Sequence, residues 1–277
     1  MTQYDNRYPP VGAGVGAVAI DEGLRAYMSR VYNYMALGVA VTGLVAYFVF
    51  TQTTTADFAL AAKLTNGAAL LAKAAGKNDP ALYFTPLGAA IFRTWLFWVL
   101  LLAPLGLSWW LSGSIHTMRP ATAQIAFWAF SALVGVTLSI IFIRYTQGSI
   151  ARALFMAAAV FGALSLYGYT TKRDLSGWGT FLFMGMIGAI VASFVSIFLA
   201  MYFQVPFPML QFIISMVVLL VFAGFTAYDT QRIKEEYVYS GGAVGAMESM
   251  AISGALHLYI SFLNIFQALL SLFGDRE

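Results

Sequence analysis

Residues 250–273 read MAISGALHLYISFLNIFQALLSLF and contain no Lys, Arg, Asp or Glu. A helix of about 20 mostly apolar residues crosses the roughly 30 Å hydrocarbon core of a bilayer, so this stretch predicts a transmembrane helix. Six further stretches upstream meet the same criterion. They are Tyr32–Phe50, Thr94–Ser112, Thr122–Tyr145, Ile150–Tyr169, Gly179–Phe203 and Met209–Tyr228. The sequence therefore predicts an all-α integral membrane protein with seven transmembrane helices.

The composition agrees with a membrane protein and excludes several other classes. Apolar residues make up 60% of the 277 positions and charged residues only 10%, against about 25% charged residues in a soluble domain. The net charge is only +3 and the basic residues are scattered, so nucleic-acid binding is not expected. Cysteine is absent, which rules out disulfides and thiolate metal sites. No cofactor is predicted.

The N-terminal residues 1–31 form a polar tail that ends in a short amphipathic segment. Within Ile20–Val31 the residues Leu24, Tyr27, Met28 and Val31 share one helical face. That face predicts either a short interfacial helix on the membrane or the water-exposed start of the first transmembrane helix. Residues 32–277 then form the membrane domain.

Residues 51–93 form an insertion that is long for a membrane loop. Leu60, Leu64, Ala68 and Leu71 follow a helical spacing, and Lys63, Lys73 and Lys77 argue against a further span. We expect an extramembrane segment, mostly helical between Ala56 and Ala75, on the outer side. It is either a surface flap over the bundle or a docking site for a partner protein.

Basic residues in short loops predict the orientation, because positive charge favours the cytoplasmic side. Long loops cross membranes largely regardless of charge, so residues 51–93 are left out of the comparison. The short loops on the C-terminal side then retain only Arg144, Arg152 and Arg276. The N-terminal side holds more: Arg7, Arg25, Arg30, Arg119, Lys172, Arg173, Arg232 and Lys234. We expect a cytoplasmic N-terminus and a periplasmic C-terminus.

Signatures of enzymes are missing from the sequence. HExxH, GxSxG and GxxxxGK[ST] motifs do not occur. Ser253 and His257 stand four residues apart on one predicted helix, so they cannot oppose each other across a substrate as nucleophile and base do. The sequence predicts no catalytic residues and no enzyme.

Polar residues in the last two predicted helices are the candidates for a functional site. Asp229 closes the sixth span, where a carboxylate costs free energy unless it is paired or hydrated. His257, Ser261 and Asn264 follow at positions i, i+4 and i+7 of the seventh span and so share one face. They are either a polar wall opposite Asp229 or hydrogen-bonding groups between helices. Likewise Asp229 is either a pore carboxylate or an interfacial residue at a helix end.

Three stretches resemble the bacterial form of the transmembrane Bax-inhibitor-motif family. They are Leu166–Ser176 (LYGYTTKRDLS), Phe225–Ile233 (FTAYDTQRI) and Leu258–Phe266 (LYISFLNIF), and the similarity covers roughly Arg93 to Gly274. The resemblance implies seven helices, with the last one central and wrapped by the other six. It also implies a pH-sensitive calcium leak, controlled by two aspartates that share a proton and pair with an arginine.

The resemblance assigns the first aspartate to Asp229, while Ser261 stands at the position of the second. A hydroxyl does not titrate near neutral pH, so Ser261 cannot form half of a carboxylate pair. Arg119 lies close to the position of the arginine, where Thr117 aligns. His257, one turn before Ser261, could supply the missing titratable group, because an unperturbed imidazole titrates near pH 6.5.

Two functions are therefore compatible with the sequence. The first is a pH-sensitive calcium leak channel of a bacterial inner membrane, with Asp229 as its pore carboxylate. The second follows from the resemblance as well: a non-transporting accessory protein that binds and modulates a membrane-anchored AAA protease complex. Calcium flux through liposomes distinguishes the two.

Overall fold

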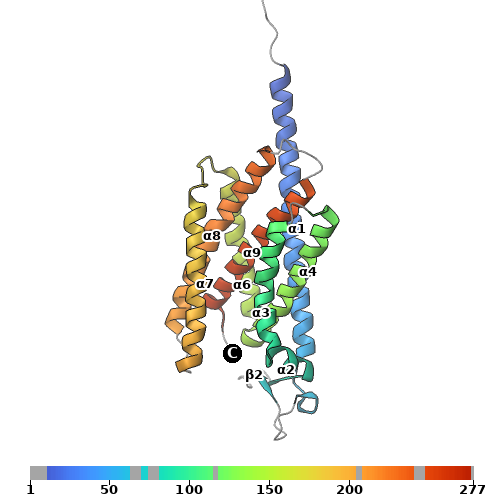
Figure 1. The fold of residues 1–277 in the computed structure, drawn as a ribbon, viewed down its shortest axis with the longest axis vertical. Helices are drawn as coiled ribbons and strands as arrows, with labels where there is room; N and C mark the ends of the chain where they lie inside the picture. Colours follow the sequence, from blue (N-terminus) through green and yellow to red (C-terminus); the bar gives the residue numbers. More distant parts are fainter. Residues whose placement is uncertain are drawn as a thin grey trace, which may run out of the picture.

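The computed structural model describes residues 11–62, 70–73, 81–114, 118–203, 208–239 and 247–275. Helices dominate this part of the chain and run along a common direction (Figure 1). The long helices are α1 (Val11–Thr53), α3 (Leu96–Ser114), α4 (Pro120–Leu138), α6 (Gln147–Thr170), α7 (Trp178–Phe203), α8 (Pro208–Tyr239) and α9 (Met247–Phe273). Short helices α2 (Pro86–Phe92) and α5 (Ile141–Arg144) join them.

Six helical stretches in the described residues are long and apolar enough to cross a membrane. The pair α2 and α3 makes a seventh if it is counted as one span, bent by 59° at its break. The break falls at the residues between Phe92 and Leu96, just after the short helix that Pro86 begins. The protein is thus an all-helical membrane protein, as the apolar stretches of the sequence predict.

Helix α9 is the central helix of the bundle. Within its most apolar window 61% of the residues are buried, against 11–33% in the other spanning stretches. It contacts α1, α4, α6 and α8, while α3 packs against α4 and α7 against α8. In Figure 1 α9 runs obliquely through the middle of the bundle. The prediction of a central last helix is confirmed.

Hydroxyl groups join the helices across this apolar core. The Tyr259 hydroxyl of α9 lies 2.6 Å from Thr42 Oγ1 of α1. On the other side of α1, the Tyr32 hydroxyl lies 2.6 Å from Ser165 Oγ of α6, which lies 3.0 Å from Thr230 Oγ1 of α8. Because lipid offers no hydrogen bonds, such pairs fix which helices are neighbours.

Helix α1 begins well before the predicted span. It runs without interruption from Val11, so the segment Ile20–Val31 is the start of the same helix and not a separate one. Its apolar face does not lie on a membrane surface, because Leu24, Tyr27, Met28 and Val31 belong to the protein core. The Tyr27 ring stacks on Tyr237 of α8 with centroids 5.0 Å apart.

The insertion at residues 51–93 differs from its prediction. In place of the helix expected between Ala56 and Ala75, its described residues include a small antiparallel sheet, with strand order β1-β3-β2. The strands are β1 (Thr54–Thr55), β2 (Leu71–Lys73) and β3 (Leu82–Phe84), and a 3-10 turn, η1, covers Phe58–Leu60. The helical spacing was misleading because Leu60 and Leu71 lie in different short elements. Leu64 and Ala68 lie outside the described residues.

The end of α9 is attached to the start of α6. Asp275 forms an ion pair with Arg152, and the Ser149 hydroxyl also bonds its carboxylate. These two donors hold the pKa of Asp275 below its ordinary value. The attachment is therefore intact at neutral pH and is lost only as the pH falls through that lowered pKa.

Candidate functional site

Asp229 lies on the buried face of α8, where it meets α9. Its exposed fraction is 8%, and the hydroxyl of Ser261 on α9 is a hydrogen-bond partner of its carboxylate. Ser261 itself is buried. The two positions that the resemblance pairs are therefore in contact, although the second carries a hydroxyl and not a carboxylate.

Small residues allow the helices around Asp229 to approach closely. A Cβ atom at Gly168 of α6 would collide with the backbone carbonyl of Ala227 on α8. A Cβ atom at Gly254 of α9 would lie 3.1 Å from the Ile233 side chain of α8. Glycine at these positions brings α6, α8 and α9 together next to the carboxylate.

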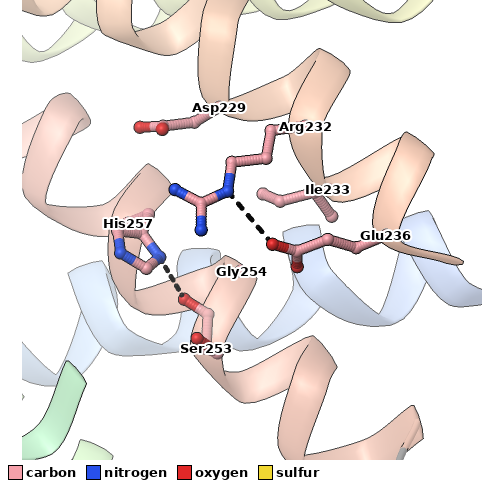
Figure 2. Close-up of a pocket in the computed structure, with 7 residues that line it drawn as sticks. All are labelled: Asp229, Arg232, Ile233, Glu236, Ser253, Gly254 and His257. Carbon is pink, nitrogen blue, oxygen red and sulfur yellow. Dashed lines mark hydrogen bonds and ion pairs between the residues drawn. The ribbon is translucent and has the colours of Figure 1, made fainter. Parts of the chain in front are cut away.

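A cavity of about 170 Å³ opens beside Asp229, between the last turns of α8 and the first turns of α9. Its lining is mostly polar, with Ile233 as the apolar exception (Figure 2). The residues that line it are Asp229, Arg232, Ile233, Glu236, Ser253, Gly254 and His257. The cavity therefore connects a buried carboxylate with the end of the bundle at which α8 ends and α9 begins.

The Arg232 side chain lines this cavity and is 55% exposed. Figure 2 shows its guanidinium reaching from α8 between Asp229, His257 and Glu236. Its Nε donates to Glu236 Oε1 at 3.1 Å, across one helical turn. Arg232 and Glu236 are both close enough to Asp229 to interact with it electrostatically. A cation of the protein thus occupies the space between two carboxylates.

His257 lines the opposite wall of the cavity. Its Nδ1 lies 2.9 Å from the Ser253 carbonyl oxygen, one turn earlier on α9. A carbonyl oxygen only accepts hydrogen bonds, so Nδ1 carries the proton and Nε2 is the atom at which the ring charge changes. This bond fixes the orientation of the ring.

The other predicted site residues do not line the cavity. The Asn264 side chain donates to the Ile260 carbonyl oxygen of its own helix at 2.8 Å. Arg119 is exposed and forms the N-terminal cap position of α4. Thr117, which aligns with the family's arginine, lies outside the described residues. Of the five predicted residues, Asp229, His257 and Ser261 come together.

Arg232 and Glu236 were missed as site residues by the sequence reasoning, which singled out Asp229 as the one acidic group at the end of this span. A signal was available, since positions 229, 232 and 236 follow the i, i+3, i+7 spacing of one helical face. Helix α8 continues to Tyr239, eleven residues beyond the predicted end of the span at Tyr228, and this extension places both side chains beside Asp229.

The connector between α6 and α7 is fastened to the same part of α8. Gln231 Nε2 donates to the Arg173 carbonyl oxygen, and Gln231 Oε1 accepts from the Leu175 N–H, each at 2.8 Å. Lys234 Nζ donates to the Tyr169 carbonyl oxygen at 2.9 Å. The stretches Leu166–Ser176 and Phe225–Ile233 are therefore bonded to each other in the folded protein.

Asp174 lies in this connector, between Arg173 and Leu175, and is exposed. Its carboxylate accepts the Ser176 N–H at 2.8 Å, and this bond lowers the pKa of Asp174 below its ordinary value. Asp174 is thus ionised at neutral pH.

The donor set of the cavity does not form a tight metal site. Within the described residues no three His, Asp or Glu side chains come together as a metal-binding group. A cation that entered the cavity would meet Asp229 as a single buried carboxylate, with Glu236 nearer the surface. Such a site attracts a cation without holding it in a full ligand shell.

Comparisons with known proteins agree with this architecture. Residues 24–277 match the family model described as inhibitor of apoptosis-promoting Bax1. The chain is similar to an uncharacterized protein of Caulobacter vibrioides, with 39% identity over 94% of this chain and 92% of the relative. It is also similar to the inner membrane protein YbhL of Escherichia coli, with 37% identity over 92% of this chain and 94% of the relative. A protein of Rickettsia prowazekii is 37% identical over 93% of this chain and 92% of its own length.

Proposed function

The chain belongs to the Bax inhibitor-1 family of membrane proteins, and on that basis we propose that it is a pH-sensitive cation leak channel. Calcium is the cation we expect, and Asp229 is the carboxylate that the ion passes. One observation carries the proposal: a buried carboxylate stands at the inner end of a polar cavity, between the central helix and α8.

Burial of Asp229 argues for a role in ion passage. A charged group at the centre of a membrane costs about 2.5–3.5 kcal/mol on insertion scales, so it is found mainly where it faces a cavity or a partner. Asp229 has both, through the cavity and through Ser261. Interhelical packing alone would be served equally well by a neutral side chain such as Asn.

Arg232 acts in this proposal as a tethered cation that competes with the permeating ion. While its guanidinium is held by Glu236, the charge of Asp229 is available to an entering cation. Movement of the guanidinium toward Asp229 would neutralise the carboxylate and close the path. The two arrangements differ only in which carboxylate the arginine pairs with.

His257 provides the sensitivity to pH. Protonation places a positive charge on the cavity wall opposite Arg232, which repels an entering cation. Acidification therefore reduces cation occupancy in two ways, by adding this positive charge and by protonating the carboxylate. Flux should fall as the pH is lowered.

The setting we propose is a bacterial inner membrane with the N-terminus in the cytoplasm. The similarity to an inner membrane protein of Escherichia coli supports the membrane, and the excess of Lys and Arg in the short N-terminal-side loops supports the orientation. The cavity would then open toward the cytoplasm, since it lies at the end of the bundle where α1 begins. Calcium would enter the protein from the periplasmic end of the bundle, opposite the cavity.

The experiment is a flux measurement on the purified protein. Vesicles of phosphatidylethanolamine and phosphatidylglycerol that contain a calcium dye are compared with and without the protein, at several pH values. We expect calcium entry above the protein-free rate at neutral pH and a decrease on acidification. Rates equal to those of protein-free vesicles at every pH would refute conduction, and an accessory role in contact with another membrane protein would replace it.

A further inference from the structure

The small sheet between α1 and α2 carries large apolar side chains on both faces. Thr54 of β1 pairs with Phe84 of β3, and these two point toward the helices, where Phe84 packs against Phe92 at a centroid distance of 5.9 Å. Cross-strand neighbours share a face. The opposite face therefore contains the next pair, Thr55 and Tyr83.

That opposite face carries Thr55, Leu71 and Tyr83, and together with the exposed Phe58 and Leu60 of the neighbouring 3-10 turn we call it the outer sheet face. Leu71 of β2 pairs with Tyr83, and the Phe58 ring contacts the Tyr83 ring edge-on at 5.7 Å. Leu60 is 63% exposed, Phe58 53% and Leu71 50%. An antiparallel sheet with one face on the core normally presents polar residues on the other. Exposure of these large apolar side chains to water is therefore unfavourable.

The sheet is fixed rigidly to the end of a membrane-spanning helix. Thr53, the last residue of α1, accepts a backbone bond from Thr85 at 3.0 Å, and Thr85 Oγ1 donates to the Gln52 carbonyl oxygen at 2.9 Å. A Cβ atom at Gly88 of α2 would collide with the Thr53 carbonyl. The outer sheet face therefore cannot swing away from the bundle to bury itself elsewhere.

Exposed apolar side chains also occur in the helical residues on either side of this sheet. Phe48, in the penultimate turn of α1, is 63% exposed, as expected for a side chain in contact with lipid. Trp95, at the break between α2 and α3, is 75% exposed, and Leu87 of α2 is 52% exposed. Tryptophan is enriched where a membrane meets water, because its ring is apolar and its N–H is polar.

We infer that the outer sheet face is inserted into the lipid headgroup region of the membrane. The sheet and α2 then form an interfacial anchor at the end of α1, and the bend between α2 and α3 turns the chain from the membrane surface into the bilayer. The prediction of a flap over the bundle is replaced by a segment that contacts lipid.

The absence of cysteine allows a direct test with single spin labels. Leu60→Cys and Leu71→Cys place a nitroxide on the outer sheet face of the full-length protein, in vesicles of phosphatidylethanolamine and phosphatidylglycerol. Phe155→Cys, on the exposed side of α6, serves as the lipid reference, and Ser176→Cys, in the exposed connector after α6, serves as the water reference. The collision rates of each label with oxygen and with a water-soluble nickel complex are measured by power saturation.

We expect the oxygen-to-nickel ratio of the labels at positions 60 and 71 to lie between those at positions 155 and 176, as it does for a label among lipid headgroups. A preference for nickel like that at position 176 would show that the face lies in water. Low collision rates with both reagents would show that protein covers the face, either another part of the chain or a partner. Either result would overturn the inference, and circular dichroism verifies that each variant is folded.

Discussion

The contact between Asp229 and Ser261 sets the chemistry of the site at the scale of single residues. The Ser261 hydroxyl stabilises the carboxylate by a hydrogen bond but takes up no proton near neutral pH. The charge state of the cavity therefore depends on the groups that face Asp229, which are Arg232 and Glu236 on α8 and His257 on α9. Glu236 of α8 is therefore the second carboxylate that lines the cavity.

Ser261→Asp is expected to make the calcium flux depend more steeply on pH near neutrality. Two buried carboxylates in contact cannot both ionise at low cost, so the pair would share a proton, which the single native carboxylate cannot do. Initial calcium flux into vesicles, measured from pH 5 to 9, reports the slope. The control is Ser261→Asn, whose side chain has nearly the size of the introduced Asp but no charge, and it should keep the native slope. Equal slopes in Ser261→Asp and Ser261→Asn would contradict the expectation.

At this scale, sequence reasoning named three residues that the structure brings together and missed two charged residues beside them. Asp229 was identifiable because a carboxylate is rare in an apolar helix, and His257 and Ser261 because they form a polar stripe. Arg232 and Glu236 look like ordinary charges beyond a span, and only the extension of α8 to Tyr239 reveals their place in the cavity. Arg119 was proposed from the resemblance alone, and the structure leaves it exposed at the start of α4.

At the scale of the elements, close helix contacts place the site. Helix α6 crosses α8 at Gly168 and Ala227, two residues before Asp229. The same part of α8 holds the connector after α6 through Gln231. A shift of α8 relative to α6 would therefore move both the carboxylate and the connector.

Gly168→Ala is expected to destabilise the protein by about 1–3 kcal/mol, the usual cost of overpacking a tight contact. The added Cβ atom would press against the backbone of Ala227, which cannot rotate away as a side chain could. Gly162→Ala, two turns earlier on α6, adds the same atom where nothing lies within 4 Å. Thermal unfolding in detergent should show a lower melting temperature for Gly168→Ala only. Equal melting temperatures for the two variants would refute the tight crossing.

The elements that the sequence could not predict are the shortest ones. Hydropathy identifies spans because about 20 apolar residues must be consecutive. The strands contain only two or three residues each, and Leu71 pairs with Tyr83 across the sheet. Strand pairing between positions so far apart leaves no periodic signal, whereas an Ala-rich segment with regularly spaced leucines imitates a helix.

The whole molecule is a bundle in which the most buried helix is also the last one. Counting the bent pair α2 and α3 as one span gives seven crossings, and with this odd number we expect the two termini on opposite sides of the membrane. Figure 1 shows the start of α1 and the C-terminus toward opposite ends of the bundle. The 24 residues of α6 span about 36 Å at 1.5 Å per residue, enough to cross the bilayer once.

Cysteines at the two ends of α6 provide a test of this topology. We expect a membrane-impermeant maleimide to label Gln147→Cys in intact spheroplasts and Ser176→Cys only after lysis, because Ser176 lies on the side of the N-terminus. Both positions are exposed, and the native chain offers no competing thiol. The reverse pattern would invert the orientation, and labelling of both in intact cells would mean that α6 does not cross the membrane.

The central claim is that the charge of Asp229 carries the cation path, and Asp229→Asn tests it most directly. The variant keeps the size of the side chain and a hydrogen-bonding oxygen for Ser261, while it removes the negative charge. Glu235→Gln, an equivalent change at an exposed position of the same helix, is the matched control. The measurement is the initial rate of calcium entry into vesicles from pH 5 to 9. We predict that Asp229→Asn falls to the protein-free rate or loses its pH dependence while Glu235→Gln matches the native protein. Native flux from Asp229→Asn at every pH would contradict the claim.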